Sequence, residues 1–323
     1  MTDFAVLVQP SANRVYGQAA PRLACAELRV LLGVEGEVVE LGGVPYIGFS
    51  ADDGVDLGPV SALSSLYALF EVADGLLRPV PVDRGERFDD DLITIQRYTG
   101  KTNEQFTKLL LNLAVASATG SGGVRRVLDP LAGRGTTLNH ALLAGLDAAG
   151  VEADGRAVDA YEAFLSQWLK DKRVKHKVAR ARVRREGKVV GRRFDVVVDG
   201  SLSVTMIHDD TRFVREHFGK GSFDAVVADL PYGVQHGGRA EDGRRARSPL
   251  ALVESSVEGW AAVLRAGGAM ALACNVRTLP RADVADVLAG AGLSVCPYEG
   301  FEHRVDHAIQ RDVVVAVKPG RAG

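Results

Sequence analysis

Four short apolar segments of this sequence each end on an acidic residue: VRRVLD (124–129), AAGVE (148–152), VTMIHDD (204–210) and DAVVAD (224–229). Runs of this kind are typical of strands that are buried on both faces of a sheet. From Leu92 onward they alternate with helical patterns, which predicts a parallel, doubly wound α/β sheet. Because such sheets bind ligands beyond the carboxyl ends of their strands, we expect the acids to meet at a binding edge.

The first 88 residues follow a different pattern and predict a small α+β module. Short strand-like runs accompany two helix-like stretches, at residues 20–33 and 60–77. A polar connector that contains proline, VPVDRGERFDDD (80–91), comes next. We therefore expect two domains, a possible RNA-binding module at residues 1–88 and a larger domain at residues 89–323.

Composition excludes several classes of protein. The 323 residues are 46% hydrophobic and 25% charged, which is typical of a soluble globular protein. No run approaches the ~18 apolar residues of a membrane span, and the N-terminus lacks the pattern of a signal peptide. Cys25, Cys274 and Cys296 are isolated, so neither disulfides nor a zinc site are indicated. We expect a cytoplasmic protein without a metal or a membrane partner.

Positive charge is concentrated between Lys170 and Arg193. This segment has twelve Lys and Arg against two acids, a local charge of +10 in a chain whose net charge is −2. Such a concentration indicates a polyanion partner. The turn-like REGK (185–188) predicts a basic hairpin insertion near residues 170–199. A solvated hairpin without a partner is the alternative. The residues expected to contact RNA here are Arg180, Arg182, Arg184 and Arg185, and we expect their replacement to leave cofactor affinity unchanged.

A second basic stretch follows the last of the four apolar segments. The loop VQHGGRAEDGRRARSP (234–249) is rich in glycine and carries Arg244, Arg245 and Arg247. A polar, glycine-rich loop beside a binding edge is typical of a mobile lid. These three arginines are therefore further candidates for contact with RNA, and an ordinary surface loop is the alternative.

The segment DPLAGRGT (129–136) predicts a ligand-binding loop before a helix. Gly133 and Gly135 let the backbone pass close to a ligand, and the third glycine of the nicotinamide-binding pattern is absent because Leu138 stands there. The acid before the loop, Asp129, favours a ligand that carries an ammonium group. Glu152 is placed to accept the hydroxyl protons of a ribose.

Asp209 and Asp210, at the end of the third strand, are placed to accept a hydrogen bond from an adenine amino group. A ligand with an amino acid at one end and adenosine at the other is S-adenosylmethionine.

Three motifs make the chain similar to a known family. DPLAGRGTTL resembles the DPxxGxGT cofactor motif and DLPYG (229–233) resembles the (D/N/S)PPY motif of amino-methyltransferases. RYTGKTNEQFTKLLLNLA (97–114) is similar to the helix before the cofactor strand in THUMP-associated tRNA guanine-N2 methyltransferases of the UPF0020-like group. The resemblance covers residues 92–318. Leu230 replaces the usual first proline, and Arg134 replaces a small residue between the glycines.

The resemblance implies a Rossmann-like class I methyltransferase sheet and a set of functional residues. Its seven strands are expected near 124–129, 148–152, 203–208, 223–229, 269–275, 294–298 and 309–317, the last antiparallel. The expected cofactor-binding residues are Thr102, Asp129, Pro130, Gly133, Gly135, Thr136, Glu152, Asp209 and Asp210. The expected catalytic residues are Asp229, Leu230, Pro231 and Tyr232.

Chemistry explains why these four residues stand together. An exocyclic amino group on a base is a poor nucleophile because its lone pair is delocalised into the ring. If the Asp229 carboxylate and the Leu230 carbonyl accept its two protons, the lone pair becomes available, and both oxygens stabilise the developing positive charge. Pro231 fixes the turn, and Tyr232 stacks on a base that has turned out of its helix.

Asp229 favours guanine, since guanine presents N1–H and N2–H side by side to one carboxylate. The family resemblance favours RNA, and tRNA in particular, as the partner. Two alternatives stay open: a DNA adenine-N6 or cytosine-N4 methyltransferase, and a non-catalytic RNA-binding protein with a methyltransferase-like fold.

Overall fold

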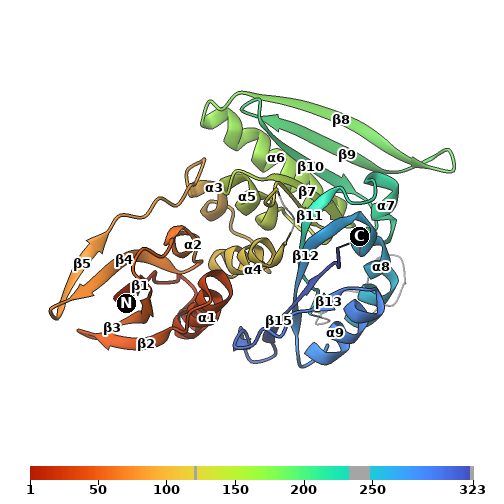
Figure 1. Ribbon diagram of the computed structural model, residues 1–323. Helices are drawn as coiled ribbons and strands as arrows, with labels where there is room; N and C mark the ends of the chain where they lie inside the picture. Colours follow the sequence, from red (N-terminus) through yellow and green to blue (C-terminus); the bar gives the residue numbers. More distant parts are fainter. Residues whose placement is uncertain (120–121, 233–247, 321–323) are drawn as a thin grey trace.

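The computed structural model of the protein describes residues 1–119, 122–232 and 248–320. The chain forms two β-sheets (Figure 1). A five-stranded antiparallel sheet lies within residues 2–80, and a ten-stranded mixed sheet lies within residues 126–317. The mixed α/β class predicted from the sequence is confirmed.

The smaller sheet has the strand order β2-β3-β1-β4-β5. Its strands are β1 (Thr2–Val8), β2 (Glu37–Leu41), β3 (Val44–Ala51), β4 (Leu66–Ala73) and β5 (Leu76–Val80). Two helices accompany it, α1 (Arg14–Leu32) and the single turn α2 (Gly58–Ser61). Helix α1 begins after Asn13, whose side chain accepts the backbone N–H groups of Val15 and Tyr16, and it ends at Gly33 with φ of 74°.

The expectation of a helix over residues 60–77 was wrong. Residues 66–73 of that segment form β4, which pairs with β1 and, through a hairpin, with β5. Asp74 and Gly75 form the hairpin turn with φ of 54° and 73°. An Asp-Gly pair between apolar runs is a strong signal for such a turn. The apolar run itself does not distinguish a helix from a buried strand.

The larger sheet has the order β13-β15-β12-β11-β6-β7-β10-β9-β8, and β14 pairs with β15 beside this path. Strands β12, β11, β6, β7 and β10 are mutually parallel, whereas β15 and β9 are antiparallel to their neighbours β12 and β10. The strands are β6 (Arg126–Asp129), β7 (Asp147–Glu152), β8 (His176–Arg185), β9 (Lys188–Val198), β10 (Leu202–His208), β11 (Phe223–Asp229), β12 (Leu264–Asn275), β13 (Ser294–Val295), β14 (His303–Arg304) and β15 (Gln310–Val317).

The seven expected strands are present, with the last antiparallel between its neighbours. The strand expected at 294–298 is shorter, because only Ser294–Val295 pairs with β15. The basic segment forms a hairpin whose turn is at Glu186 and Gly187, with φ of 51° and 79°. The hairpin continues the sheet beyond β10 (Figure 1). The last pair between β9 and β10 is Arg192 and His208.

Helices cover both faces of the larger sheet. One face packs against α4 (Glu104–Ser117), α5 (Thr136–Leu143) and α6 (Gly155–Asp171). The other packs against the 3₁₀ turn η1 (Thr211–Phe213), α7 (Val214–His217), α8 (Pro249–Val263) and α9 (Arg281–Gly290), and the single turn α3 (Asp91–Thr94) precedes α4. In the described part of the chain, no helix has the length and apolar character needed to cross a membrane.

The helix expected at 97–114 begins later than predicted. Asn103 caps α4 by accepting the backbone N–H of Phe106, so residues 97–103 form a loop before the helix. This loop passes the carboxyl edge of the sheet and contributes to the site described below.

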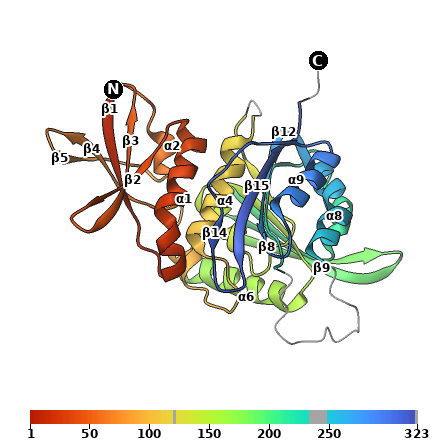
Figure 2. The ribbon, with the colours of Figure 1, turned by 90° about the horizontal axis from the view of Figure 1, so that it is seen from below.

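The N-terminal module packs on the larger sheet through α1 and α4 (Figure 2). The rings of Tyr16 and Phe106 lie 6.5 Å apart, centre to centre, and both contact His303. Glu27 of α1 is buried and accepts hydrogen bonds from Ser64 and, at 2.7 Å, from Asn112 of α4. One hydrophobic core thus spans both sheets, and two domains, 1–88 and 89–323, remain a prediction.

Candidate active site

Three acids end neighbouring parallel strands of the larger sheet. Strand β6 lies between β7 and β11, so Asp129, Glu152 and Asp229 reach the same carboxyl edge. In the register of β6 and β7, Asp129 stands opposite Gly150, two residues before Glu152. The sheet therefore brings together side chains that are up to one hundred positions apart in the sequence.

Asp129 is the most buried of these carboxyl groups. Its side chain is 4% exposed and accepts the backbone N–H of Leu131 at 2.9 Å. Burial raises the pKa of Asp129 to about 7, and the negative charges of Glu152 and Asp229 act in the same direction. The carboxyl group is therefore only partly ionised at neutral pH. A cation bound beside it would favour the ionised form.

The glycine loop after β6 is held by close packing. Gly135 has φ of 78°, and a Cβ atom there would lie 2.2 Å from a ring carbon of Tyr161, so only glycine fits. Gly133 donates its backbone N–H to Glu152 Oε2 at 2.8 Å, and a Cβ atom on it would meet open space. Glu152 also accepts the N–H of Asp154 at 2.7 Å. The carboxylate of Glu152 thus joins the loop to the end of β7.

The rest of the loop contacts the segment before α4. Pro130 is buried, and Thr136 begins α5 with its hydroxyl 3.1 Å from that of Tyr98. The guanidinium of Arg134 lies over the Tyr98 ring, 4.6 Å from its centre. Arg134, which departs from the family motif, is therefore bound to an aromatic face at the rim of the edge.

Asp209 and Asp210 bind protein groups at the end of β10. Asp209 is 7% exposed and accepts from Arg185 Nη2 at 2.7 Å and His217 Nε2 at 2.8 Å. Asp210 accepts the backbone N–H and the guanidinium of Arg212. A role of either acid toward adenine remains a proposal. His217 was not anticipated from the sequence.

The four hairpin arginines have different surroundings. Arg185 turns toward the sheet to bind Asp209, and it contacts Glu216 at 2.8 Å. Arg180 pairs with Glu162 of α6, and Arg184 donates to the carbonyl of Gly187 at 3.2 Å. Arg182 is exposed on β8. The expectation that replacing the four arginines leaves cofactor affinity unchanged stays a prediction. Arg185 differs from the other three because its guanidinium binds Asp209, one of the acids proposed for the cofactor.

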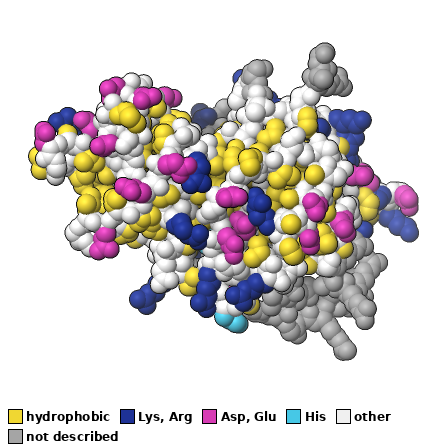
Figure 3. All heavy atoms as spheres, turned by 60° about the horizontal axis from the view of Figure 1, so that its bottom comes forward, with side chains coloured by type: hydrophobic (Ala, Val, Ile, Leu, Met, Phe, Trp, Pro, Cys, Tyr) yellow, Lys and Arg dark blue, Asp and Glu magenta, His cyan; other side chains and the backbone are white. Residues whose placement is uncertain are grey.

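The second basic stretch lies largely outside the described residues, and this includes Arg244, Arg245 and Arg247. In the described ranges, no group of three or more His, Cys, Asp or Glu side chains is arranged to hold a metal ion. On the face drawn in Figure 3, Lys and Arg side chains are interspersed with Asp and Glu.

The Asp229 carboxylate is surrounded by hydrogen-bond donors. The Tyr232 hydroxyl donates to both of its oxygens, at 2.6 and 2.7 Å. Thr102 Oγ1 donates to Oδ2 at 2.7 Å, and Arg311 Nη2 lies 3.2 Å from the same atom. Arg311 also donates to the Tyr232 hydroxyl oxygen. Thr102, predicted from the sequence to bind the cofactor, therefore contacts the predicted catalytic acid.

Leu230 and Pro231 form the turn between Asp229 and Tyr232. Leu230 is 1% exposed, and its backbone N–H donates to the carbonyl of Ala273 at 2.9 Å, so β12 fixes the backbone after the acid. Pro231 is exposed. This turn folds the Tyr232 side chain back onto Asp229.

Arg311 of β15 was missed by the sequence analysis. Its side chain is 3% exposed, and its guanidinium lies 4.3 Å from the centre of the Phe106 ring and 5.2 Å from that of Tyr232. The available signal was an arginine at the start of the apolar run QRDVVVAV (310–317). A buried guanidinium needs a charged partner, and here that partner is Asp229.

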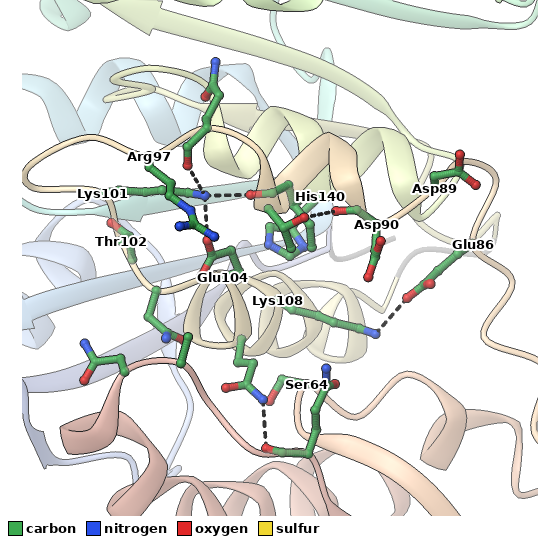
Figure 4. Close-up of a pocket in the computed structure, with 18 of the residues that line it drawn as sticks. Ser64, Glu86, Asp89, Asp90, Arg97, Lys101, Thr102, Glu104, Lys108 and His140 are labelled. Carbon is green, nitrogen blue, oxygen red and sulfur yellow. Dashed lines mark hydrogen bonds and ion pairs between the residues drawn. The ribbon is translucent and has the colours of Figure 1, made fainter. Parts of the chain in front are cut away.

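A pocket of about 1010 Å³ lies between the N-terminal module and α4 (Figure 4). Tyr98 and Thr102 line it. Outside the pocket wall, Tyr98 contacts Thr136 and Thr102 contacts Asp229. Lys101 donates to Glu104 at 2.5 Å inside it. Burial lowers the pKa of His140, also in its wall, to about 3, so this imidazole is neutral. The pocket was not anticipated, because its walls come from both parts of the chain.

Comparisons with known proteins give similarity only at the level of structure. No family model matches the chain, and no curated protein matches it. TrmN from Thermus thermophilus is 14% identical, with a TM-score of 0.49 over 98% of this chain and 100% of that one. An rRNA methylase from Streptococcus thermophilus is 14% identical, with a TM-score of 0.35 over 61% and 87%. A TehB-like SAM-dependent methyltransferase from Corynebacterium glutamicum is 16% identical, with a TM-score of 0.35 over 60% and 80%.

The larger sheet itself has the Rossmann-like strand arrangement that the sequence predicts. Five parallel strands are followed by the antiparallel β15, which lies between β12 and β13, and helices cover both faces. The hairpin β8–β9 is an addition at the β10 edge.

Replacing Asp129 with Asn tests the burial of its carboxyl group. Because the pKa of Asp129 is raised to about 7 in the folded protein, the folded state holds the proton more tightly than the unfolded chain. The wild type should therefore lose stability as pH rises from about 4 to 7. We expect Asp129→Asn to be more stable at pH 8 by about 1 to 3 kcal/mol and to approach the wild type near pH 4.

Thermal unfolding followed by circular dichroism between pH 4 and 8 measures this difference. Asp286→Asn, on the exposed side of α9, is the control and should show no such trend. A difference for Asp129→Asn that stays constant with pH, or a loss of stability at pH 8, would contradict the assignment.

Proposed function

We propose that this protein is an S-adenosylmethionine-dependent RNA methyltransferase that acts on an exocyclic amino group, with N2 of a guanosine in tRNA as the leading target. The observation that carries the proposal is the Asp229 carboxylate. It stands one strand away from Asp129 and the glycine loop, at the end of β11. An acceptor for amino protons thus lies beside a candidate cofactor site.

The residues at the strand edge fit the cofactor chemically. Glu152 and Asp229 are close enough to Asp129 for their negative charges to help raise its pKa, and such an accumulation of carboxyl groups favours a cationic ligand. S-adenosylmethionine is cationic, and when bound it supplies a methyl group attached to a positively charged sulfur. The residues proposed to hold it are Asp129, Pro130, Gly133, Gly135, Thr136, Glu152, Asp209 and Asp210.

Asp229 is proposed to accept protons of the target amino group and to stabilise positive charge on its nitrogen. The Leu230 carbonyl is the second acceptor, and only its backbone is required there. Tyr232 is proposed to stack on the base. For this, its hydroxyl must leave Asp229, where it now donates to both oxygens. Substrate binding is therefore coupled to a rotation of Tyr232.

The proposed RNA partner rests on the family resemblance of residues 97–114 and on the charge of the hairpin. The N-terminal module is proposed to help hold RNA, because it forms one wall of the large pocket beside Thr102. A cytoplasmic location is part of the same proposal.

Cofactor binding and methyl transfer test the proposed function together. We expect calorimetry to detect S-adenosylmethionine binding by the wild type and at least tenfold weaker binding by Asp129→Ala and Glu152→Ala, with Asp286→Ala as the control. Tritium transfer from labelled cofactor should be seen with tRNA and absent with DNA.

Other outcomes would support one of the alternative functions. Transfer to adenine or cytosine in DNA would support the DNA methyltransferase alternative, and RNA binding without transfer would support the non-catalytic one. A wild type that does not bind the cofactor would overturn the proposal.

The hairpin is proposed to hold the phosphate backbone through Arg182 and Arg184. We expect the double variant Arg182→Ala/Arg184→Ala to bind tRNA more weakly and with a salt slope shallower by about 1.5 to 2. Two phosphate contacts are lost, and each contributes about 0.7 to 0.9 to the slope through the counterions that it releases on binding. Cofactor affinity should not change. Arg185→Ala should also weaken cofactor binding, because Arg185 holds Asp209.

Filter binding of tRNA at several salt concentrations gives the slope. Arg304→Ala, an exposed arginine on β14, serves as the control. A double variant with an unchanged slope would show that RNA is held elsewhere.

A further inference from the structure

Asp229 and Arg311 form a hydrogen-bonding array beside the candidate catalytic turn. We propose that this array reads the Watson–Crick edge of guanine, and that Arg311 is the specificity-determining residue, which donates to O6 of the base. The inference rests on the proposed function, since it concerns the base that the methyltransferase site receives. It extends that proposal by assigning a hydrogen-bond donor, Arg311, to O6 of the base.

In the structure, Tyr232 occupies the positions on the carboxylate that the base would use. A carboxylate offers about four lone-pair positions. Here the Tyr232 hydroxyl bridges Oδ1 and Oδ2, while Thr102 and Arg311 both contact Oδ2. For a base to face both oxygens of Asp229, the Tyr232 hydroxyl that bridges them has to leave.

When the Tyr232 hydroxyl leaves, two hydrogen-bond acceptors and one donor become available side by side. One acceptor position opens on Oδ1 and one on Oδ2. Arg311 Nη2 lies beside Oδ2, 3.2 Å away, and has then lost the phenolic oxygen to which it donated. The order is acceptor, acceptor, donor, as on the Watson–Crick edge of cytosine.

Guanine is the base that complements this order. Its N2–H and N1–H match the two oxygens of Asp229, and its O6 matches the Arg311 donor. Adenine and cytosine would instead bring the lone pair of a ring nitrogen against a carboxylate oxygen. Neutral 2,6-diaminopurine keeps the 2-amino group but reverses the donor and acceptor pattern at the other two positions, so it is a matched probe.

Arg311 is held firmly enough to discriminate between bases. It belongs to β15, which is paired on both sides, where His303 and Asn275 stand opposite it. The Phe106 ring lies 4.3 Å from its guanidinium, and its Nε is buried without a hydrogen-bond partner. A donor left unpaired in such a place is costly, so a base without an acceptor beside it is disfavoured.

Binding of nucleoside 5′-monophosphates tests the proposal directly. In the presence of S-adenosylhomocysteine, we expect the wild type to bind guanosine monophosphate about ten- to one-hundredfold more tightly than the adenosine, cytidine and 2,6-diaminopurine analogues. Arg311→Met should weaken the binding of guanosine monophosphate by a similar factor. The affinity for the diaminopurine analogue should change by less than about threefold. The preference for guanine should therefore nearly disappear, as measured by ligand-observed nuclear magnetic resonance.

Controls separate specificity from folding. Arg304→Met should keep the wild-type preference. Arg311→Lys keeps the charge but lacks the planar fork, so it should reduce the preference even if the Met variant does not fold. A wild type without a preference for guanine, or an Arg311 variant that weakens all nucleotides equally, would overturn the proposal.

Failure of the proposed function would look different. Selective binding of guanosine monophosphate without tritium transfer to RNA would refute the methyltransferase activity and leave the reading of guanine intact. Transfer to adenine or cytosine in RNA would refute the reading and leave the methyltransferase activity intact.

Discussion

Parallel pairing of β6 with β7 and β11 is the constraint on which the site depends. Each of these strands ends on an acid, and parallel pairing is what brings Asp129, Glu152 and Asp229 to one edge. The arrangement has an energetic cost, because burial and neighbouring negative charges raise the pKa of Asp129 to about 7. A cationic ligand that contacts this edge would offset that cost, which links the architecture to the cofactor that we propose.

A second constraint comes from the packing of Arg311 under the N-terminal module. Its guanidinium lies between the rings of Phe106 and Tyr232, and its charge is balanced by Asp229. Tyr232 completes the cluster by donating to Asp229. The Asp229 carboxylate is therefore paired with donors of the protein itself. The substrate that we propose has to replace the tyrosine hydroxyl with donors of its own. In the function that we propose, this requirement makes recognition of the base and opening of the site a single event.

Local patterns were sufficient to predict much of the fold. The apolar strands, the acids that end them, the glycine loop and the Glu-Gly turn of the hairpin are each encoded within about ten residues. Contacts between distant segments could not be predicted from such local patterns. Thr102 and Arg311 reach Asp229 from 127 and 82 positions away, and Arg185 turns to Asp209 only because β9 pairs with β10. The helix expected at 60–77 failed for a local reason, since the Asp74-Gly75 turn was overlooked.

A crystal structure of the protein with S-adenosylhomocysteine tests the central claim most directly. We expect the amino group of the ligand to contact Asp129, its ribose hydroxyls to contact Glu152, and its sulfur to face Asp229. Electron density for the ligand at another place, or an edge that stays empty at saturating ligand, would contradict the claim that these strand ends form a methyltransferase site.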